Sequence, residues 1–160
     1  MAIRSKIKFF LITILLASVS FSCNKKNDII PDVVVDFYID INDARFSTQL
    51  NSIGGSVAID AGSLNEPYAA GFNASGIIIT RGVDEYYAYD RTCPHEYSLD
   101  KSVVRINIDQ TGFAKAICPV CKTPFELLSF GTPTPGGVSR YPLKNYRTSF
   151  DGRFIRVWNN

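Results

Sequence analysis

The sequence is poor in histidine and cysteine and has no long apolar segment. Its 160 residues contain one histidine and four cysteines, and the apolar run near the start, at residues 9–21, is only 13 residues long. A helix that spans a bilayer needs about 20 apolar residues, so this run is too short to cross a membrane. The sequence also has no Ser/His/Asp or paired-carboxylate constellation, which makes an enzyme with its own catalytic domain the weakest hypothesis.

Strong charge of either sign is missing as well. The chain has 17 basic and 15 acidic residues, and three of the basic residues fall in residues 1–22, which contain no acidic residue. The remainder therefore carries a net charge of −1. Nucleic-acid binding needs a basic face, so we expect no nucleic-acid partner. With 46% hydrophobic residues, the chain is long enough for one domain with a real core.

Residues 1–22 have the pattern of an export signal, with three basic residues followed by the apolar run at 9–21. Cys23 comes next, and polar residues occupy 24–27. This arrangement resembles a bacterial lipoprotein signal, which implies cleavage before Cys23 and attachment of diacylglycerol to its sulfur. Acyl chains would anchor the protein to a membrane that it does not span. The alternative is a plain signal peptide beside an incidental cysteine.

The rest of the chain divides into a short tether and a folded domain. We expect residues 23–31 to form the lipidated tether and residues 32–160 to form the domain. The predicted location is the bacterial cell envelope, with the protein lipid-anchored. No acidic residue directly follows Cys23, which favours a position facing the periplasm.

From residue 32 onward the sequence is typical of an all-β domain. Residues 33–41 are rich in strand formers, and residues 103–108 and 113–117 alternate between apolar and polar side chains. Residues 109–112 between these two segments predict a hairpin turn. No long segment has a helical repeat. Several short strands at close spacing indicate a small antiparallel β-sandwich or barrel.

The residues that bear chemistry gather in two short segments. Cys93 and His95 form a C-x-H segment, which we call the first prong, and Cys118 and Cys121 form a C-x-x-C segment, the second prong. The predicted hairpin lies in the 22 residues between them, so two strands could bring the prongs together. Once Cys23 is assigned to lipid, the prongs hold every remaining cysteine and the only histidine. Since three thiols cannot all pair within one chain, the four side chains predict a metal site.

Both prongs resemble those of the Rieske [2Fe–2S] family, which has C-x-H in one loop and C-x-x-H, commonly followed by Gly-Ser-x-Phe, in a second. Thr123 falls at the family's serine, Phe125 at its aromatic residue, and residues 131–137 resemble the Gly/Pro-rich loop that covers the cluster. The resemblance spans roughly residues 32–160. It implies a Rieske-like β-fold with a two-loop subdomain that binds the cluster. It also suggests that Thr123 donates a hydrogen bond to a cluster or cysteine sulfur, the alternative being a loop threonine satisfied by the backbone.

Two positions depart from the family pattern and bear on the chemistry. Cys121 stands where the family has its second histidine, and Lys122 stands where it has glycine. By resemblance, Cys93 and Cys118 would hold one iron, and His95 and Cys121 the other. Two histidine ligands raise Rieske potentials to about −150 to +300 mV, from about −400 mV in all-cysteine ferredoxins. A site with three thiolates and one imidazole should therefore have an intermediate or low potential.

These observations leave three alternatives for the site. A [2Fe–2S] cluster would make the protein a membrane-anchored electron carrier that passes one electron at a time between unidentified partners. Zinc is the rival metal, because three cysteines and one histidine form a known structural zinc set. The third alternative is a metal-free binding module with a disulfide from Cys118 to Cys121 or to Cys93. The export signal lacks an Arg-Arg pair, which indicates export in the unfolded state and favours the two rivals.

Overall fold

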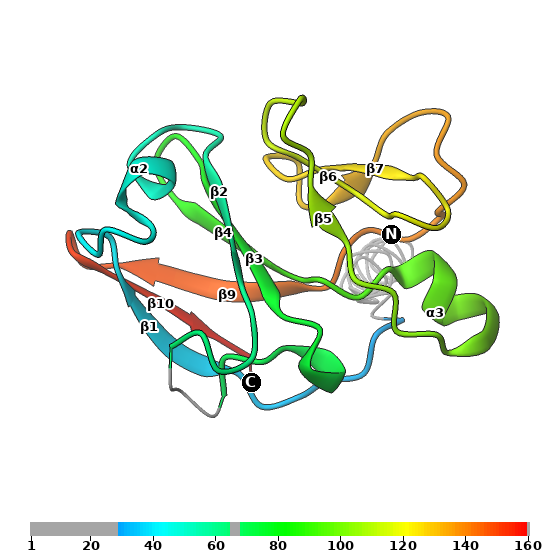
Figure 1. The fold of residues 1–160 in the computed structure, drawn as a ribbon, viewed down its shortest axis with the longest axis horizontal. Coiled ribbons are helices and arrows are strands. Elements are labelled where there is room, and N and C mark those ends of the chain that lie inside the picture. Colours follow the sequence, from blue (N-terminus) through cyan, green and yellow to red (C-terminus); the bar gives the residue numbers. More distant parts are fainter. Residues whose placement is uncertain (1–28, 65–67, 160) are drawn as a thin grey trace, which may run out of the picture.

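The computed structural model describes residues 29–64 and 68–159 (Figure 1). The predicted signal segment, the predicted lipidation site at Cys23 and most of the predicted tether lie outside these described residues. Within the described ranges, no helix combines the length and apolar character that a membrane crossing requires.

The larger unit of the fold is an antiparallel sheet of six strands. The strand order is β1-β10-β9-β4-β3-β2. The last two strands of the sequence, β9 and β10, therefore lie between β1 and β4 in the sheet. The strands are β1 (Asp36–Asp40), β2 (Ser56–Ile59), β3 (Ile77–Arg81), β4 (Tyr86–Asp90), β9 (Asn145–Phe150) and β10 (Phe154–Trp158). Figure 1 shows the sheet as a strongly curled surface.

Alternation of side chains along the strands accounts for the main core. Phe37 and Ile39 in β1 are buried and pair in register with Val157 and Ile155 in β10, which are also buried. Successive side chains of a strand point to opposite faces of its sheet, so these four residues share the inner face. They belong to a cluster of buried apolar residues that includes members from all six strands of the sheet.

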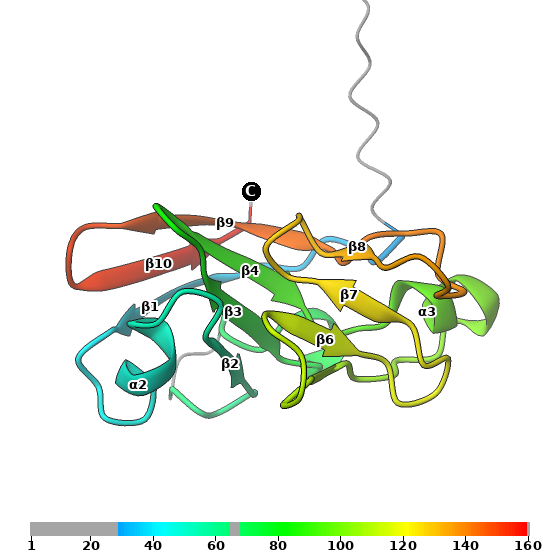
Figure 2. The same cartoon turned by 90° about the horizontal axis from the view of Figure 1, so that it is seen from above.

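A smaller four-stranded sheet packs beside β3 and β4 (Figure 2). Its strands, in spatial order, are β5 (Asn107–Ile108), β6 (Lys115–Ile117), β7 (Pro124–Glu126) and β8 (Thr132–Pro133). A second core lies between the two sheets and contains Tyr89 from β4 together with Phe125 and Leu127. The Tyr89 hydroxyl donates a hydrogen bond of 2.7 Å to the Leu127 carbonyl, which joins the sheets.

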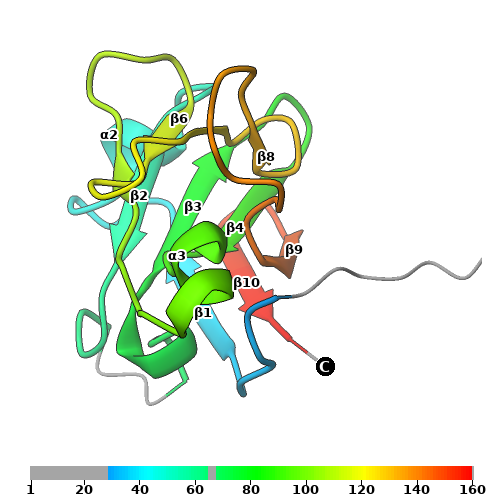
Figure 3. The same cartoon turned by 90° about the vertical axis from the view of Figure 1, so that its right-hand side faces the viewer.

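Among the residues that the structure describes, short helical segments occupy three of the connections. They are α2 (Ser47–Leu50), the 3₁₀ turn η1 (Phe72–Ala74) and α3 (Pro94–Asp100). Only α3 completes about two turns, and it begins inside the first prong. Figure 3 looks onto the end of the molecule that carries α3.

The predicted all-β antiparallel fold is confirmed. Of the two loops of the predicted subdomain, the second prong lies within the smaller sheet, and the first lies between β4 and α3. The predicted hairpin also exists, because Asn107 in β5 pairs with Ile117 in β6. Its strands are shorter than the alternating pattern indicated, and the first strand covers residues 36–40 rather than 33–41.

Asp90, at the end of β4, is a buried junction between distant segments. Its carboxylate accepts hydrogen bonds from the Phe72 and Thr92 amides at 2.6 and 2.8 Å. It also accepts from the hydroxyls of Ser75 and Tyr146 at 2.9 and 2.6 Å. A buried carboxylate is tolerated when donors satisfy it, and these donors fix the chain directly before the first prong.

The start of the described chain is attached to the domain by Lys144. The side chain of this lysine is only 2% exposed, and its Nζ donates to the Asp32 carboxylate at 2.6 Å and to the Ile30 carbonyl at 3.2 Å. Ile30 itself is buried. Residues 30–32 are therefore packed against the folded domain.

Candidate metal centre

The first prong is held at the junction between β4 and α3. Cys93 directly precedes α3, its amide donates to the Val104 carbonyl at 2.8 Å, and its carbonyl accepts from the Tyr97 amide at 3.1 Å. Pro94 opens the helix, where a missing amide hydrogen breaks no helical bond. The buried Cys93 side chain is thus fixed by backbone bonds on both sides.

The second prong forms the turn between β6 and β7. The Cys118 amide donates to the Thr123 carbonyl and the Lys122 amide donates to the Cys118 carbonyl, both at 3.1 Å. Lys122 has a φ of 59°, in the left-handed region that favours glycine. Its Nζ donates to the Pro119 carbonyl at 2.5 Å. The turn therefore places a lysine in a conformation that glycine adopts more readily.

Three sulfurs and one carboxylate meet where the two prongs converge. Ligand atoms of Cys93, Glu96, Cys118 and Cys121 all lie within 4.8 Å of one another. The Sγ atoms of Cys93 and Cys121 are 3.7 Å apart. All three cysteines are free thiols, and two of them are fully buried. The thiols that the sequence pattern placed in one site are therefore neighbours in space.

His95 lies outside this group of four. It is half-buried and lines a neighbouring hollow of about 330 Å³ with Ser98, Leu99, Val138, Arg140 and Tyr141. The structure thus brings three of the four predicted ligands together and adds Glu96, which the sequence analysis did not consider. Glu96 follows Cys93 by three residues in a segment with Pro at the first helical position, and this helix-start pattern was the available signal.

Burial governs the protonation of the thiols. It raises the pKa of both Cys93 and Cys118 above the ordinary value. Backbone amides oppose the rise: the Glu96 amide donates to the Cys93 sulfur, and the Val120 and Cys121 amides donate to the Cys118 sulfur. Because thiolates are the metal-binding form, a metal must displace these protons when it binds.

Thr123 links the second prong to the loop that follows β8. Its hydroxyl oxygen lies 3.3 Å from the Cys121 sulfur and accepts hydrogen bonds from the Val138 and Ser139 amides at 3.1 and 3.2 Å. The side chain is fully buried. Backbone amides therefore satisfy Thr123, which is the alternative role weighed from the sequence, and in this structure its oxygen accepts from the Cys121 thiol rather than donating to it.

The loop at residues 131–137 packs closely on this threonine. A Cβ atom added to Gly137 would lie 2.6 Å from the Thr123 Cγ2 atom, so only glycine fits there without a shift. Val138, directly after the loop, is 55% exposed, and Val120 in the second prong is 57% exposed. The loop thus covers one side of the second prong, and the residue that follows it, Val138, exposes an apolar side chain.

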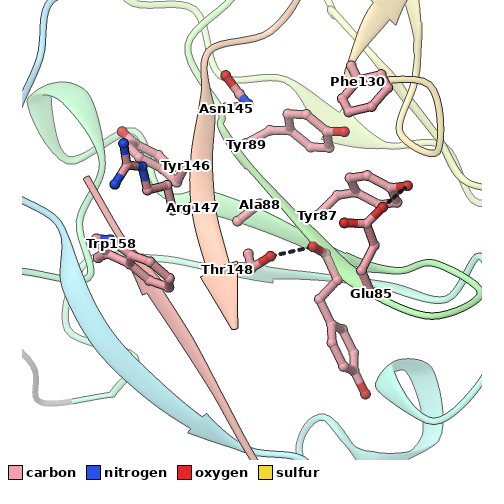
Figure 4. A pocket seen from close by; sticks show the side chains of 11 residues that line it. Glu85, Tyr87, Ala88, Tyr89, Phe130, Asn145, Tyr146, Arg147, Thr148 and Trp158 are labelled. Atoms are coloured by element: carbon pink, nitrogen blue, oxygen red, sulfur yellow. Dashed lines mark hydrogen bonds between the residues drawn. The ribbon is translucent and has the colours of Figure 1, made fainter. Parts of the chain in front are cut away.

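A second hollow, of about 310 Å³, lies over β4, β9 and β10 (Figure 4). Its lining includes the aromatic side chains of Tyr87, Phe130 and Trp158. Near it, the Thr148 hydroxyl donates to the Tyr86 carbonyl at 2.5 Å. The lining contains no cysteine, histidine or Glu96, so this hollow is separate from the metal centre.

The donor set fits an iron–sulfur cluster in kind and number. A [2Fe–2S] cluster takes four protein ligands, most often cysteine thiolates. Three thiols are present, and α3 offers a fourth donor from His95 or Glu96. Amide donors on two of the sulfurs favour their ionised form. The same set also fits a tetrahedral zinc ion.

Comparisons with known proteins found distant structural likenesses. No protein-family model matches the sequence, and no curated protein matches it. The ferredoxin of carbazole 1,9a-dioxygenase from Nocardioides aromaticivorans IC177 aligns with a TM-score of 0.43 and 19% identity, over 70% of this chain and 93% of that chain. A chain from a complex of reduced oxygenase and oxidized ferredoxin in carbazole 1,9a-dioxygenase aligns with a TM-score of 0.45 and 17% identity, over 76% and 92%. The fold and site define this chain as a small antiparallel β-protein with a cysteine-rich candidate metal centre.

Proposed function

We propose that this protein is a membrane-anchored, Rieske-like iron–sulfur protein that carries one electron at a time between partner proteins. The observation that supports the proposal is the convergence of three free thiols, from Cys93, Cys118 and Cys121, with a further donor from the start of α3. Exported proteins rarely keep unpaired thiols, and a metal centre gives these three a function.

A bound [2Fe–2S] cluster would supply reversible one-electron chemistry. The residues of this chain have other tasks. The cysteines would hold the irons, and the amides of Glu96, Val120 and Cys121, which donate to the Cys93 and Cys118 sulfurs, would stabilise their negative charge. Exposed apolar side chains at Val120 and Val138 offer a contact surface to a redox partner near the site.

The proposal is tested by the colour and metal content of the purified domain. Residues 24–160 should be produced in the cytoplasm, and their visible spectrum, iron, zinc and acid-labile sulfide measured. A red-brown protein with about two irons and two sulfides per chain is the expected result. A colourless, metal-free protein with a disulfide would rule out the electron carrier.

The membrane anchor is a separate part of the proposal. We expect Cys23 to carry diacylglycerol and to place the protein in the bacterial cell envelope, facing the periplasm. Mass spectrometry of the N-terminal peptide and the distribution between membrane and soluble fractions test this expectation. A Cys23→Ser chain should lose the lipid and leave the membrane fraction, and a lipid-free Cys23 in the parent chain would contradict the anchor.

A structural zinc site is the alternative function, and one distance favours it. Ligand sulfurs about 2.3 Å from a tetrahedral zinc ion are about 3.8 Å apart, and the Cys93 and Cys121 sulfurs are separated by 3.7 Å. In that case the domain would be a binding or structural module. A colourless protein with one zinc per chain in the same metal assay would establish this alternative.

A further inference from the structure

We infer that the fourth ligand of the metal centre is the Glu96 carboxylate and that His95 is not a ligand. The centre would then present three thiolates and one carboxylate. This inference rests on the proposed function only in requiring that the three thiols bind a metal. In this assignment Glu96 takes the place of His95, the ligand that the C-x-H spacing predicts.

The geometry of α3 separates the two candidate side chains. Cys93 directly precedes the helix, so His95 and Glu96 lie in its first turn. Each helical residue advances by about 100°, and residues three apart therefore lie on one face whereas residues two apart do not. Glu96 consequently lies on the side of Cys93, and its carboxylate is within 4.8 Å of all three sulfurs.

The His95 side chain is directed away from the three sulfurs in this structure. The Tyr97 amide donates to the Cys93 carbonyl at 3.1 Å, and the Ser98 hydroxyl donates to the His95 carbonyl at 2.7 Å. These bonds close the turn and fix the His95 backbone. Its side chain lines the separate hollow with Arg140 and Tyr141.

Charge supplies a second argument for a cation beside Glu96. Among residues 29–64 and 68–159, no hydrogen bond or ion pair is recorded for the Glu96 carboxylate, although the side chain is half-buried. A metal held by the three sulfurs would bring positive charge within reach of this carboxylate, because its nearest oxygen lies within 4.8 Å of each sulfur.

The carboxylate would change the chemistry of the centre. Imidazole is a neutral ligand, whereas a carboxylate adds one negative charge and a hard oxygen donor. A cluster bound this way should have a lower reduction potential than one with histidine, since reduction adds further negative charge. The site would also retain Zn²⁺ or Co²⁺ as single ions, because both accept mixed sulfur and oxygen ligands.

The test uses Co²⁺ alone as a spectroscopic probe on the full-length chain. The chain is purified in detergent, stripped of metal and kept reduced without oxygen. Glu96→Ala and the isosteric Glu96→Gln are compared with His95→Asn, and Asp100→Asn serves as a control that removes an exposed carboxylate from the same helix. Circular dichroism verifies that each variant is folded.

The two ligand assignments predict opposite results. We expect both Glu96 variants to bind Co²⁺ more weakly by about tenfold or more, since loss of even an outer hydrogen-bond partner costs 10–100-fold, and to change its visible d–d bands. His95→Asn and Asp100→Asn should match the parent. A loss of affinity in His95→Asn, or unchanged binding in both Glu96 variants, would overturn the inference.

An iron-loaded sample gives an independent readout. If Glu96 is the ligand, pulsed EPR of the reduced cluster should detect no strongly coupled imidazole nitrogen, and a strong coupling that disappears in His95→Asn would refute the inference. Failure of the parent chain to bind Co²⁺, Zn²⁺ or iron would remove the proposed function as well. Metal binding that depends on His95 removes the Glu96 inference alone.

Discussion

The Thr123 hydroxyl lies 3.3 Å from the Cys121 sulfur, and the Val138 and Ser139 amides already donate to its oxygen. A hydroxyl has two acceptor positions and one hydrogen. In this structure the Cys121 thiol is the donor to this oxygen. A metal-bound cysteine is a thiolate, which can only accept, so in the metal-bound form the hydroxyl hydrogen would be donated to the sulfur.

Replacing Thr123 with valine should affect both stability and redox behaviour. The change preserves shape but leaves two buried amides without their acceptor, at a cost of about 1–3 kcal/mol. It also removes a donor to sulfur, so the reduction potential of a bound cluster should fall. Urea unfolding and a redox titration measure the two effects.

Thr123→Ser is the matched control for this experiment, because it retains the hydroxyl. The serine variant should keep the parent potential and most of the stability. Equal potentials in the valine variant and the parent would show that the hydroxyl does not act on the sulfur.

Lys122→Gly should leave the free energy of unfolding unchanged relative to the parent protein, or raise it by up to about 1 kcal/mol. Lys122 has a φ of 59°, and a left-handed conformation costs a residue with a Cβ about 1–2 kcal/mol. Greater freedom of glycine in the unfolded chain offsets part of this gain. Both variants lose the bond from Lys122 Nζ to the Pro119 carbonyl, but only Lys122→Ala keeps the strain, so it should be the less stable of the two in urea unfolding. The reverse order would contradict the strain argument.

The sequence predicted the features that depend on local pattern. Alternating residues predicted an antiparallel β-fold, and the spacing of the cysteines predicted that Cys93, Cys118 and Cys121 approach one another. Glu96 was missed because a C-x-H segment was interpreted as a loop, whereas α3 begins within it. A helix changes which side chain shares a face with Cys93.

Features that depend on packing between distant segments could not be predicted from the sequence. The donors to Asp90 come from segments as distant as Phe72 and Tyr146, and no spacing rule connects these positions. The attachment of residues 30–32 by Lys144 joins positions more than a hundred residues apart. Both contacts join segments that lie far apart in the sequence and are brought together by the folded domain.

Asp90→Ala should destabilise the domain by about 3–5 kcal/mol, as expected when buried donors lose a charged partner. Tyr146→Phe removes one donor to the same carboxylate and should cost about 1 kcal/mol. Urea unfolding of the metal-free protein measures both. A cost for Asp90→Ala no larger than that for Tyr146→Phe would argue against Asp90 as the junction before the first prong.

Stability should fall in acid as surface carboxylates lose their partners. A hydrogen bond from Arg45 lowers the pKa of Asp43 from 3.8 to about 2, and one from Arg156 lowers the pKa of Asp36. A lowered folded-state pKa contributes stability that is present above the unfolded value and lost as pH falls through the folded value. The urea midpoint of the metal-free protein should therefore decrease between about pH 4 and pH 2.

Asp43→Asn tests the source of this dependence. The variant should show a shallower decrease of the urea midpoint over the same interval, because one of the titrating groups is absent. An unchanged slope would mean that Asp43 contributes nothing to acid sensitivity.

Because Lys144 attaches the start of the described chain to the domain, the distance between the domain and a membrane anchored at Cys23 is limited. Six residues separate Cys23 from the buried Ile30. A fully extended segment of that length can span about 25 Å at most between these two residues. Leu143, next to the attachment point, packs in the same core as Cys93 and Cys118. If Cys23 carries lipid and the three thiols bind a cluster, that end of the domain would be confined close to the headgroups, and electron exchange would depend on lateral encounters with partners in the same membrane.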